Sequence, residues 1–568
     1  MATTLKQVDV AVIGLGAAGG VAVLPLARAG LKIAGIEAGT WMDPHKDFHA
    51  DEVFNNVRRL VTSSPKAQRE IPTVRTGPGE KGVQAAAHPM MNAVGGTSIH
   101  YWAQSWRLKP WDFRTRSEVI RRYGANAIPA GTTLEDWPIT YDELAPFYER
   151  IEDEVDVSGA AGNIQGKLTG VGNPFEGPRD KEYPMPPLRG SGFTDHMADA
   201  AKTLGWKPFA PPAAINSQPR KGRGSCVYHG YCATGGCHVS AKNSTAVTTI
   251  PEAQRTKNLT IFDHAHVTRI ETDSNGRTTG VRYIRNRQEY FQPAKVVLLA
   301  GYTYENSRLL LLSKSKAYPK GLSNNHGQVG RHYFGHWGTN VTALFPSDIN
   351  IWYGLPAQGT TCDEWADDHF DHGGMGFVGG SSLHVYTERH PIDAAAMNTF
   401  GRAPSWGSAW KKFIHDAAAR QAQTYLQTNT FPYETLYLDL DDDIRDPLGD
   451  PVCRINTGGM RENERRSVLH AQGKMEEWYR AAGAIEIFKP PPAVPGVSTH
   501  AYGGTRMGDN PDTNVVNRWG FSHESPNLGI LGASVMGTSG ARNPTLTAQA
   551  LAWRTADYLA KNWKSISF

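Results

Sequence analysis

Three glycines near the N-terminus have the spacing that lets a protein backbone hold a phosphate. They are Gly14, Gly16 and Gly19, in the sequence VIGLGAAGG. In this pattern the first glycine permits a sharp turn, the second lets a pyrophosphate approach the backbone, and the third lets a helix pack closely on a strand. Glu37 follows eighteen positions after Gly19 and could accept hydrogen bonds from an adenosine ribose. The pattern predicts a dinucleotide-binding site, but it does not separate FAD from NAD.

A loop with three cysteines is the second group of residues that could do chemistry. Cys226, Cys232 and Cys237 are separated by five and four residues in a glycine-rich segment, so their thiols could surround one small centre. His229 or His238 could complete a Cys3His zinc site. The thiols could also be unligated and buried. The spacing therefore leaves an iron–sulfur cluster, a zinc site and no metal as alternatives.

The glycine pattern requires a strand, a turn and a helix in a fixed order. Residues 8–13 predict a strand, residues 17–29 a helix and residues 32–37 a second strand. Only Lys6 precedes this apolar segment and glycines interrupt it, which is not typical of a secretion signal. We interpret the segment as part of a nucleotide-binding domain.

The composition excludes several classes of protein. With 568 residues, 40% of them hydrophobic, the chain can bury a large core and form roughly three to four domain-sized units. The formal net charge is only +4, without a dense basic run, so nucleic-acid binding has no electrostatic support. No apolar stretch approaches the ~20 residues that a membrane span needs. Five cysteines in a chain of this length do not form a disulfide framework.

The rest of the chain divides into two kinds of pattern. Residues 259–300 are rich in strand formers, and the last strand ends at Ala300-Gly301 before a helix, which resembles a second close approach of the backbone to a dinucleotide. The tail, residues 526–561, predicts a strand, a glycine-rich turn and a helix. Residues 340–440 alternate apolar and polar side chains and predict antiparallel strands. Strand–glycine–helix units thus lie toward both ends of the chain, and the middle differs.

Four separated segments resemble, in order, motifs of the glucose–methanol–choline (GMC) oxidoreductases. They are the fingerprint ending in IEAG, AVGGTSIHYWAQSWR at 93–107, DWPITYDELAPFYE at 136–149, and NLGILGASVMGTSGARNPTLTAQALA at 527–552. Within that family, residues 172–188 and the cysteine loop resemble the flavoprotein subunits of bacterial gluconate, fructose and glucose dehydrogenases.

The resemblance implies an α/β fold for the nucleotide-binding part, and an α+β fold for the chain as a whole. A Rossmann-like FAD-binding domain of GMC type would carry an inserted substrate domain with an antiparallel sheet. The FAD-binding domain is expected to be discontinuous, over residues 1–110, 215–330 and 490–568. The substrate-binding domain and cap segments would take residues 111–214 and 331–489. FAD becomes the expected cofactor, because the family binds flavin at this fingerprint.

The resemblance also implies which residues contact the flavin. Beyond Gly14, Gly16, Gly19 and Glu37, the expected contacts are Gly95, Gly96, Thr97, His100, Val267, Ala300, Gly301, Ala533, Asn543, Pro544 and Thr545. The segment GGTSIH resembles one of pyranose oxidase and the sugar dehydrogenases, in which the histidine is bonded covalently to the flavin. A covalent link through His100 is therefore expected. The alternative is a loop histidine that only packs near the ring or faces solvent.

Two further motif positions imply the catalytic pair. His500 lies in STHAYGG and Asn543 in ARNPT, where the family places a catalytic histidine and an asparagine or histidine. Alcohol oxidation removes the hydroxyl proton and transfers a hydride to the flavin, and a neutral imidazole is the usual base near pH 7. Asn543 could hold the hydroxyl or the developing alkoxide, but it cannot titrate. The alternative is a buried structural histidine. His332 or His336 could line a pocket, but a structural role is expected for both.

The expected function is FAD-dependent oxidation of a sugar, glycoside or sugar-derived alcohol to the ketone or lactone. Three cysteines match the three terminal irons of a [3Fe-4S] cluster, which the related glucose and fructose dehydrogenase subunits carry on a similar loop. The cluster would pass electrons to a cytochrome or quinone. A small partner subunit with an export signal is expected, which would make the protein periplasmic, with the cytoplasm as the alternative.

Two other functions compete with a dehydrogenase. One is a pyranose-oxidase-like enzyme that uses O2 directly. The other is a non-catalytic flavin-binding electron-transfer subunit, which the presence of both His500 and Asn543 argues against. No motif in the sequence indicates which sugar or which carbon is oxidised.

Overall fold

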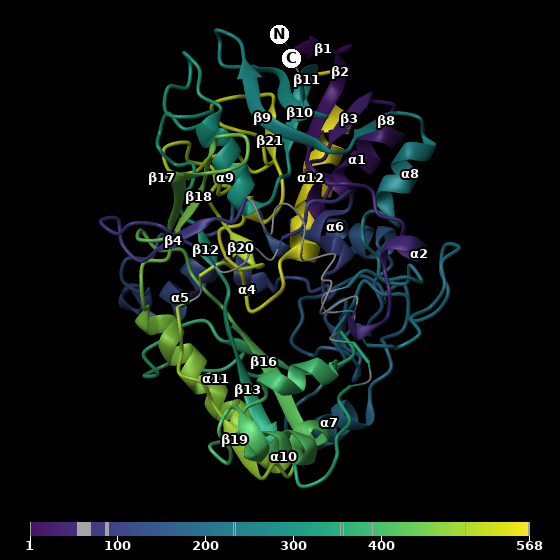
Figure 1. The fold of residues 1–568 in the computed structure, drawn as a ribbon. Coiled ribbons are helices and arrows are strands. Elements are labelled where there is room, and N and C mark those ends of the chain that lie inside the picture. The colour runs from purple at the N-terminus through teal and green to yellow at the C-terminus, as the bar shows by residue number, and fades with distance from the viewer. Residues whose placement is uncertain are drawn as a thin grey trace.

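The computed structural model describes residues 2–53, 70–85, 90–230, 232, 235–352, 354–355, 357–367, 369–388, 390–494 and 496–565. The two ends of the chain lie close together at one end of the molecule, beside the largest sheet (Figure 1). A second sheet lies at the opposite end, and shorter strands and helices lie between them (Figure 1). None of the helices in the described part of the chain combines the length and apolar character that crossing a membrane requires.

The largest sheet has a parallel core built from strands that are distant in sequence. Its order is β8 (Leu259–Phe262), β3 (Ile33–Ile36), β2 (Val8–Ile13) and β11 (Gln288–Leu299), and β21 (Leu528–Ile530) also pairs with β11. β2, β3 and β21 are almost entirely apolar and mostly buried, as is the second half of β11, which is expected for parallel strands covered on both faces. The tail of the chain thus completes the sheet that its beginning starts.

The first half of β11 extends the sheet in the antiparallel direction. It pairs with β10 (Thr278–Arg285), which pairs with β9 (Ala265–Thr272), and β1 (Thr3–Thr4) lies parallel to β11. Helix α1 (Ala17–Arg28) packs against α12 (Thr545–Asn562) and α8 (Thr249–Arg255). Helix α6 (Tyr141–Glu154), which begins with a capping box formed by Thr140 and Glu143, packs on α12.

The second sheet is antiparallel and has its own hydrophobic core. Its order is β14 (Thr360–Cys362), β15 (Ser381–Val385), β16 (Gln421–Thr428), β13 (Trp337–Leu344) and β19 (Glu486–Phe488). Helices α11 (Glu462–Ala481) and α7 (Gly192–Thr203) pack against it, and α10 (Gly407–Ala417) lies at the same end of the molecule (Figure 1). The antiparallel strands expected between 340 and 440 are therefore present, with α10 among them.

Small sheets and helices join the two ends. β12 (Phe334–Gly335) pairs with β20 (Ala501–Tyr502), and a four-stranded sheet has the order β17 (Tyr437–Arg445), β18 (Pro451–Asn456), β4 (Thr73–Arg75) and β5 (Val83–Gln84). The remaining short elements are α2 (Pro44–Asp47), α4 (Pro110–Phe113), α5 (Thr115–Tyr123), β6 (Asn163–Ile164), β7 (Lys167–Leu168) and α9 (Thr303–Leu312).

The predicted fold class is confirmed, since a parallel nucleotide-binding-type sheet and a separate antiparallel sheet are both present. The domain limits stay a prediction. The largest sheet takes its strands from the three predicted FAD-binding segments, whereas β4, near the N-terminus, pairs with β18 from the predicted substrate domain.

Candidate active site

A cavity of about 620 Å³ lies where the fingerprint, the tail and the second sheet meet. Most of the predicted site residues line it: Gly14, Gly16, Glu37, Gly96, Thr97, His100, Val267, Ala300, Gly301, His500, Ala533, Asn543, Pro544 and Thr545. Gly19, Gly95 and the three loop cysteines are not among its lining residues. The structure therefore brings at least five separate sequence segments into one concave site.

Packing within the protein requires two of the three fingerprint glycines, and the third lies open beside the cavity. Gly14 has a φ of +85°, and a Cβ there would lie 2.6 Å from the carbonyl oxygen of Ala300. A Cβ on Gly19 would lie 2.0 Å from the carbonyl oxygen of Gly14. Gly16 has space, since its Cβ would meet only Gly96 Cα at 3.7 Å, and it caps the N-terminus of α1 beside the cavity. A helix N-terminus with an open backbone is an anion-binding feature, which suits a pyrophosphate.

The segment around Gly95 and Gly96 closes against the fingerprint. Both glycines have positive φ angles, +99° and +53°, and a Cβ on Gly96 would lie 2.8 Å from Gly16 Cα. Gly95 donates its backbone N–H to the carbonyl oxygen of Leu15 at 2.8 Å. Gly95 thus shapes the turn that places Gly96 and Thr97 at the cavity without lining the cavity itself.

The carboxylate of Glu37 lies at the end of β3, beside the cavity. It is buried and accepts hydrogen bonds from the backbone N–H groups of Leu15 and Gly39, both at 2.9 Å. These two bonds fix the position of the carboxylate after the parallel strand ends. An acidic group held at this edge of the sheet is the group expected to contact a ribose.

His500 and Asn543 lie together on the cavity wall. His500 Nε2 is 3.1 Å from Asn543 Nδ2, and Asn543 Oδ1 is a buried oxygen for which the described residues supply no hydrogen-bond partner. Burial lowers the pKa of His500 to about 4, so its imidazole is neutral at pH 7. The pair therefore offers a neutral base and an amide oxygen toward the same space.

His100 lies at the end of the short helical turn Gly96–Ile99 and lines the cavity. Burial, and then the nearby ammonium group of Lys242, lower its pKa to about 4. The imidazole is therefore neutral at pH 7. Lys242 itself is buried and donates to the carbonyl oxygens of Cys232 (2.7 Å) and Gly235 (2.9 Å).

Several polar and aromatic residues that were not predicted from the sequence also line the cavity. Trp102 packs against Tyr386, with ring centroids 4.9 Å apart, and against Tyr425 of β16, at 6.4 Å. Gln104 also lines the cavity, two positions beyond Trp102. The closeness of Trp102 and Gln104 to His100 in the sequence was the one available signal, whereas Tyr425 comes from a distant strand.

The three loop cysteines are near one another but do not form a ligand set. Within the described ranges, no group of three or more His, Cys, Asp or Glu side chains is arranged to hold a metal ion. Burial raises the pKa of the Cys226 thiol to about 11, and burial and then the nearby Glu388 raise that of Cys232 well above its usual range. Tyr231, Ala233 and Thr234, within the loop, lie outside the described residues.

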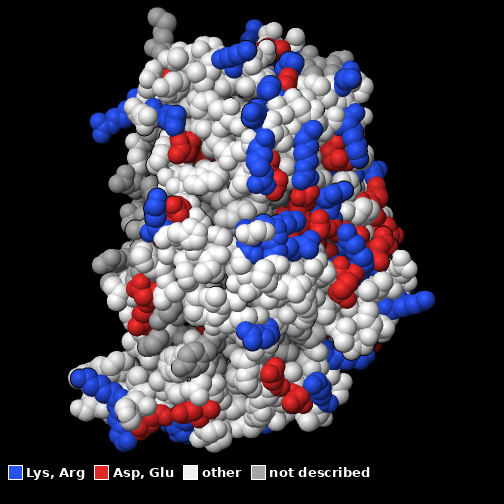
Figure 2. Space-filling view, turned by 90° about the vertical axis from the view of Figure 1, so that its right-hand side faces the viewer, with Lys and Arg blue, Asp and Glu red and all other residues white. Residues whose placement is uncertain are grey.

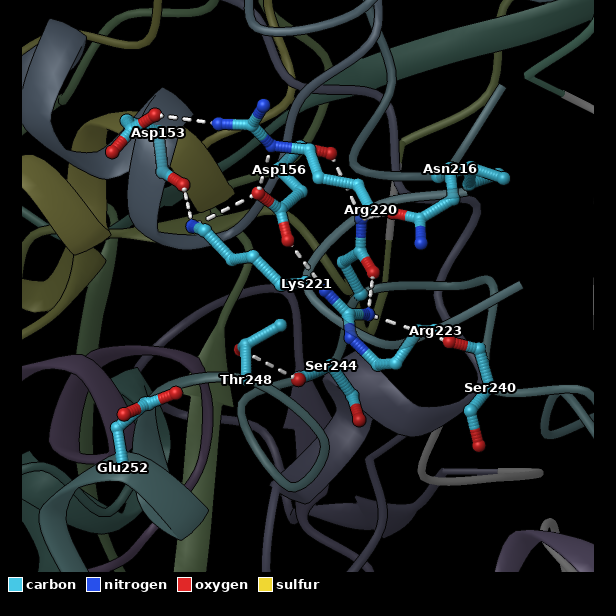
Figure 3. A network of polar contacts seen from close by, with 12 residues as sticks. Asp153, Asp156, Asn216, Arg220, Lys221, Arg223, Ser240, Ser244, Thr248 and Glu252 are labelled. Carbon is cyan, nitrogen blue, oxygen red and sulfur yellow. Dashed lines mark hydrogen bonds and ion pairs between the residues drawn. The ribbon is translucent and has the colours of Figure 1, made fainter. Parts of the chain in front are cut away.

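Side-chain contacts tie the start of the cysteine loop to the end of α6. The buried carboxylate of Asp156 binds Arg220 (2.6 Å), Lys221 (2.9 Å) and Arg223 (2.5 Å). Figure 3 shows these three cations converging on Asp156, with Asp153 bound to Arg220 beside them. The loop is thus held mainly by ion pairs rather than by regular secondary structure.

Among the residues that the structure describes, the face shown in Figure 2 has no single-sign basic patch that would attract a polyanion. Basic and acidic side chains lie intermixed across the centre and right of that face (Figure 2). A mixture of both signs cancels the field at a distance.

Comparisons with known proteins place this site in context. A family model described as GMC oxidoreductase matches residues 432–552. The chain is 30% identical to the gluconate 2-dehydrogenase flavoprotein of Pantoea cypripedii, over 99% of this chain and 95% of that protein. It is also 30% identical to a 2-methyl-1,2-propanediol dehydrogenase of Mycolicibacterium austroafricanum (100% and 97%), and 28% identical to the fructose dehydrogenase large subunit of Gluconobacter japonicus (99% and 100%).

A solved structure of pyridoxine 4-oxidase from "Mesorbium loti" has the same fold. It superposes with a TM-score of 0.62 at 17% sequence identity, covering 99% of this chain and 100% of that one. Identity this low supports the shared fold, and the near-full-length relatives carry the evidence for the family.

Proposed function

Because this chain belongs to the GMC oxidoreductase family, a group of FAD flavoproteins that oxidise CH–OH groups, we propose that it is a dehydrogenase of sugars, glycosides or related polyols. The observation that carries the proposal is the pair of His500 and Asn543 on the wall of the cavity that the fingerprint also lines. The product would be a ketone or lactone.

The cavity fits FAD. Side chains at Gly16 and Gly96 would fill the space beside the N-terminus of α1, so these glycines keep a cradle open for the pyrophosphate. Glu37 is held where the ribose would lie. Bound FAD supplies an acceptor for the hydride that leaves the substrate carbon. Val267, Ala300, Gly301, Ala533, Pro544 and Thr545 would line the remainder of the cofactor.

His500 would act as the base. Its low pKa keeps it unprotonated at neutral pH, so it can take the hydroxyl proton of the substrate at Nε2. Asn543 Oδ1 has no partner among the described residues and could accept a hydrogen bond from a substrate hydroxyl. The side chain of Asn543 also donates to Nε2, which positions the ring and substrate against each other.

The substrate end of the cavity suits a polyhydroxylated ring. Trp102 and Tyr425 present aromatic surface from opposite elements, and Gln104 adds an amide with both a donor and an acceptor. Such a mixture binds the apolar face of a sugar and its hydroxyls. The relatives named for gluconate and fructose agree with this choice, and the one named for a propanediol makes a small diol the second candidate.

The proposal includes an external electron acceptor, which the comparisons support only through the name of one relative. The fructose dehydrogenase relative is a large subunit by name, which supports a partner subunit and a cytochrome or quinone acceptor here. The [3Fe-4S] cluster on Cys226, Cys232 and Cys237 stays a prediction, because no three metal-binding side chains among the described residues are arranged to hold a metal ion. Export to the periplasm likewise stays a prediction.

Anaerobic flavin bleaching tests the proposal. Purified protein is mixed without oxygen with a panel of aldoses, ketoses, glycosides, polyols and short diols, and the flavin absorbance is followed. Bleaching by a sugar-type alcohol supports the proposal, and bleaching by short diols alone would replace the substrate class. No bleaching by any alcohol would favour a non-catalytic subunit. Comparing peroxide formation with dye reduction in air then separates an oxidase from a dehydrogenase.

A further inference from the structure

A second histidine, His336, contacts His500 from the opposite strand of the small sheet between the two ends of the molecule. β12 pairs with β20 in the antiparallel register Gly335↔Ala501. His336, which follows Gly335, therefore lies opposite His500, which precedes Ala501. The backbone N–H of His336 donates to the carbonyl oxygen of His500 at 2.9 Å. The two imidazole Nδ1 atoms are 3.2 Å apart, with the rings inclined at 75°.

The other nitrogen of His336 determines where its proton lies. His336 Nε2 is 2.8 Å from the carbonyl oxygen of Gly540. A carbonyl oxygen can only accept, so Nε2 must carry the hydrogen. Burial, and then the neighbouring His500, lower the pKa of His336 well below its usual range. The ring is therefore neutral at pH 7, and its Nδ1 has a lone pair and no hydrogen.

The lone pair on His336 Nδ1 favours one tautomer of His500. Only a donor can face it at 3.2 Å, so His500 Nδ1 carries the hydrogen and His500 Nε2 has the lone pair. The contact with Asn543 requires the same tautomer, because Asn543 Nδ2 donates to His500 Nε2 at 3.1 Å. Two independent contacts on opposite sides of the ring thus agree.

Two other polar groups near His336 Nδ1 are compatible with this arrangement. Gln427 Nε2 lies 3.0 Å away and is a second donor to the same lone pair. The hydroxyl of Tyr502 lies 3.2 Å away, but its hydrogen is directed to the carbonyl oxygen of Arg542 at 2.9 Å. Neither group supplies a hydrogen-bond acceptor that would replace His336 as the partner of His500.

We propose that His336 is a positioning residue that holds His500 in the Nδ1–H tautomer, so that Nε2 is the atom that receives the substrate proton. The proposal rests on the proposed role of His500. In the step itself, the O–H bond breaks and the proton forms a bond to the lone pair of His500 Nε2, which then no longer accepts from Asn543 Nδ2. Bound FAD would accept the C–H electron pair as hydride. The Nδ1–H bond to His336 then becomes charge-assisted and stabilises the imidazolium. His336 keeps its own proton throughout.

Two substitutions separate this role from a structural one. In His336→Asn, the amide oxygen takes about the place of Nδ1 and can accept from His500, but the bond to Gly540 is lost. In His336→Gln, the amide nitrogen can reach Gly540, but the acceptor for His500 is lost. The rate constant of flavin reduction at saturating substrate is measured by anaerobic stopped flow. We expect His336→Asn to stay within about tenfold of the wild type, and His336→Gln to lose about 10²–10⁴-fold, as expected for a wrong tautomer.

A structural role would give the opposite order, because His336→Gln retains the contact with Gly540. Equal rates for the two variants, or a faster His336→Gln enzyme, would overturn the proposal. The substrate dissociation constant should change less than the rate in both variants. Flavin content and melting temperature show whether each variant folds.

A spectroscopic readout does not depend on activity. In protein labelled with ¹⁵N-histidine, the signals of His500 are identified by their loss in His500→Ala, and their shifts report which nitrogen is protonated. We expect Nδ1–H in the wild type and in His336→Asn, and Nε2–H or a mixture in His336→Gln. Nε2–H in the wild type would refute the proposal even if no variant folded. If His500→Ala reduces its flavin at the wild-type rate, the proposed function of His500 fails instead.

Discussion

The glycine turn before α1 and the cysteine loop are both short irregular segments, but different forces hold them. The turn joins β2 to α1, and its glycines contact β11 and the Gly95–Gly96 turn through backbone atoms. The cysteine loop lies between α7 and α8, and no helix or strand of the described residues falls between these two helices. Ion pairs to Asp156 and backbone contacts from Lys242 support the loop. Residue spacing in sequence therefore determines the geometry of the first segment far more closely than that of the second.

The largest expected effect is on the glycine turn. In Gly19→Ala, the new Cβ would lie 2.0 Å from the carbonyl oxygen of Gly14, so the turn or the helix must move. Since a change of about 1.4 kcal/mol alters binding tenfold, we expect the purified variant to carry less than about a tenth of the wild-type flavin. Flavin absorbance per chain and the melting temperature are measured.

Gly473 provides the matched control for this substitution. It lies on the exposed side of α11, and a Cβ there would have no neighbour within 4 Å. Gly473→Ala should keep full flavin and stabilise the helix by about 0.5–1 kcal/mol. Equal flavin content in Gly19→Ala and Gly473→Ala would show that the turn is not held as closely as the backbone contacts indicate.

Iron analysis tests whether a cofactor organises the cysteine loop. Ligand number predicts about three irons per chain in protein prepared without air, lowered by Cys232→Ser. Electron transfer to a cytochrome should then fall more in Cys232→Ser than transfer to a small dye does. Iron near zero would contradict the cluster and leave the loop as a segment held by ion pairs, and one zinc per chain would replace the cluster with a structural zinc site.

Flavin can be retained by a covalent bond to His100 or by the glycine turns of the cavity alone, and denaturation distinguishes the two. If the imidazole is bonded to the flavin, denaturation in acid should leave the yellow colour with the protein, and His100→Ala should release it. The measurement is flavin absorbance in the precipitate and the supernatant. Complete release from the wild type would show that the cradle alone retains the cofactor.

The smallest expected effect concerns the ion pairs of the cysteine loop. Asp156→Asn keeps a side chain that tolerates the φ of +50° at this position, but it removes the buried charge that binds three cations. We expect a loss of about 1–3 kcal/mol in the free energy of unfolding and faster alkylation of Cys226 and Cys237, followed by mass spectrometry. Asp153→Asn, whose carboxylate is half exposed, should cost less than about 0.5 kcal/mol. Similar effects of the two variants would argue against anchoring by Asp156.

Local pattern predicted much of the framework of this fold. The strand at residues 8–13 is as predicted, the helix predicted at 17–29 spans Ala17–Arg28, and the tail helix predicted from Thr545 begins there. These elements could be anticipated because apolar periodicity and glycine positions act over a few residues. The motif positions His500 and Asn543 were also identified, although their contact at 3.1 Å was not.

Long-range packing decided the rest of the site. His336 and His500 are 164 positions apart, and only the pairing of β12 with β20 brings their rings together. Tyr425 reaches Trp102 because β16 lies in a sheet whose strand order is not the chain order. The sequence by itself determined the dinucleotide-binding turn, the principal helices and the family motifs, because those depend on neighbouring residues. Tertiary structure alone decided the tautomer-setting contact and the aromatic wall of the cavity, because side chains from separate elements meet only after the sheets have packed.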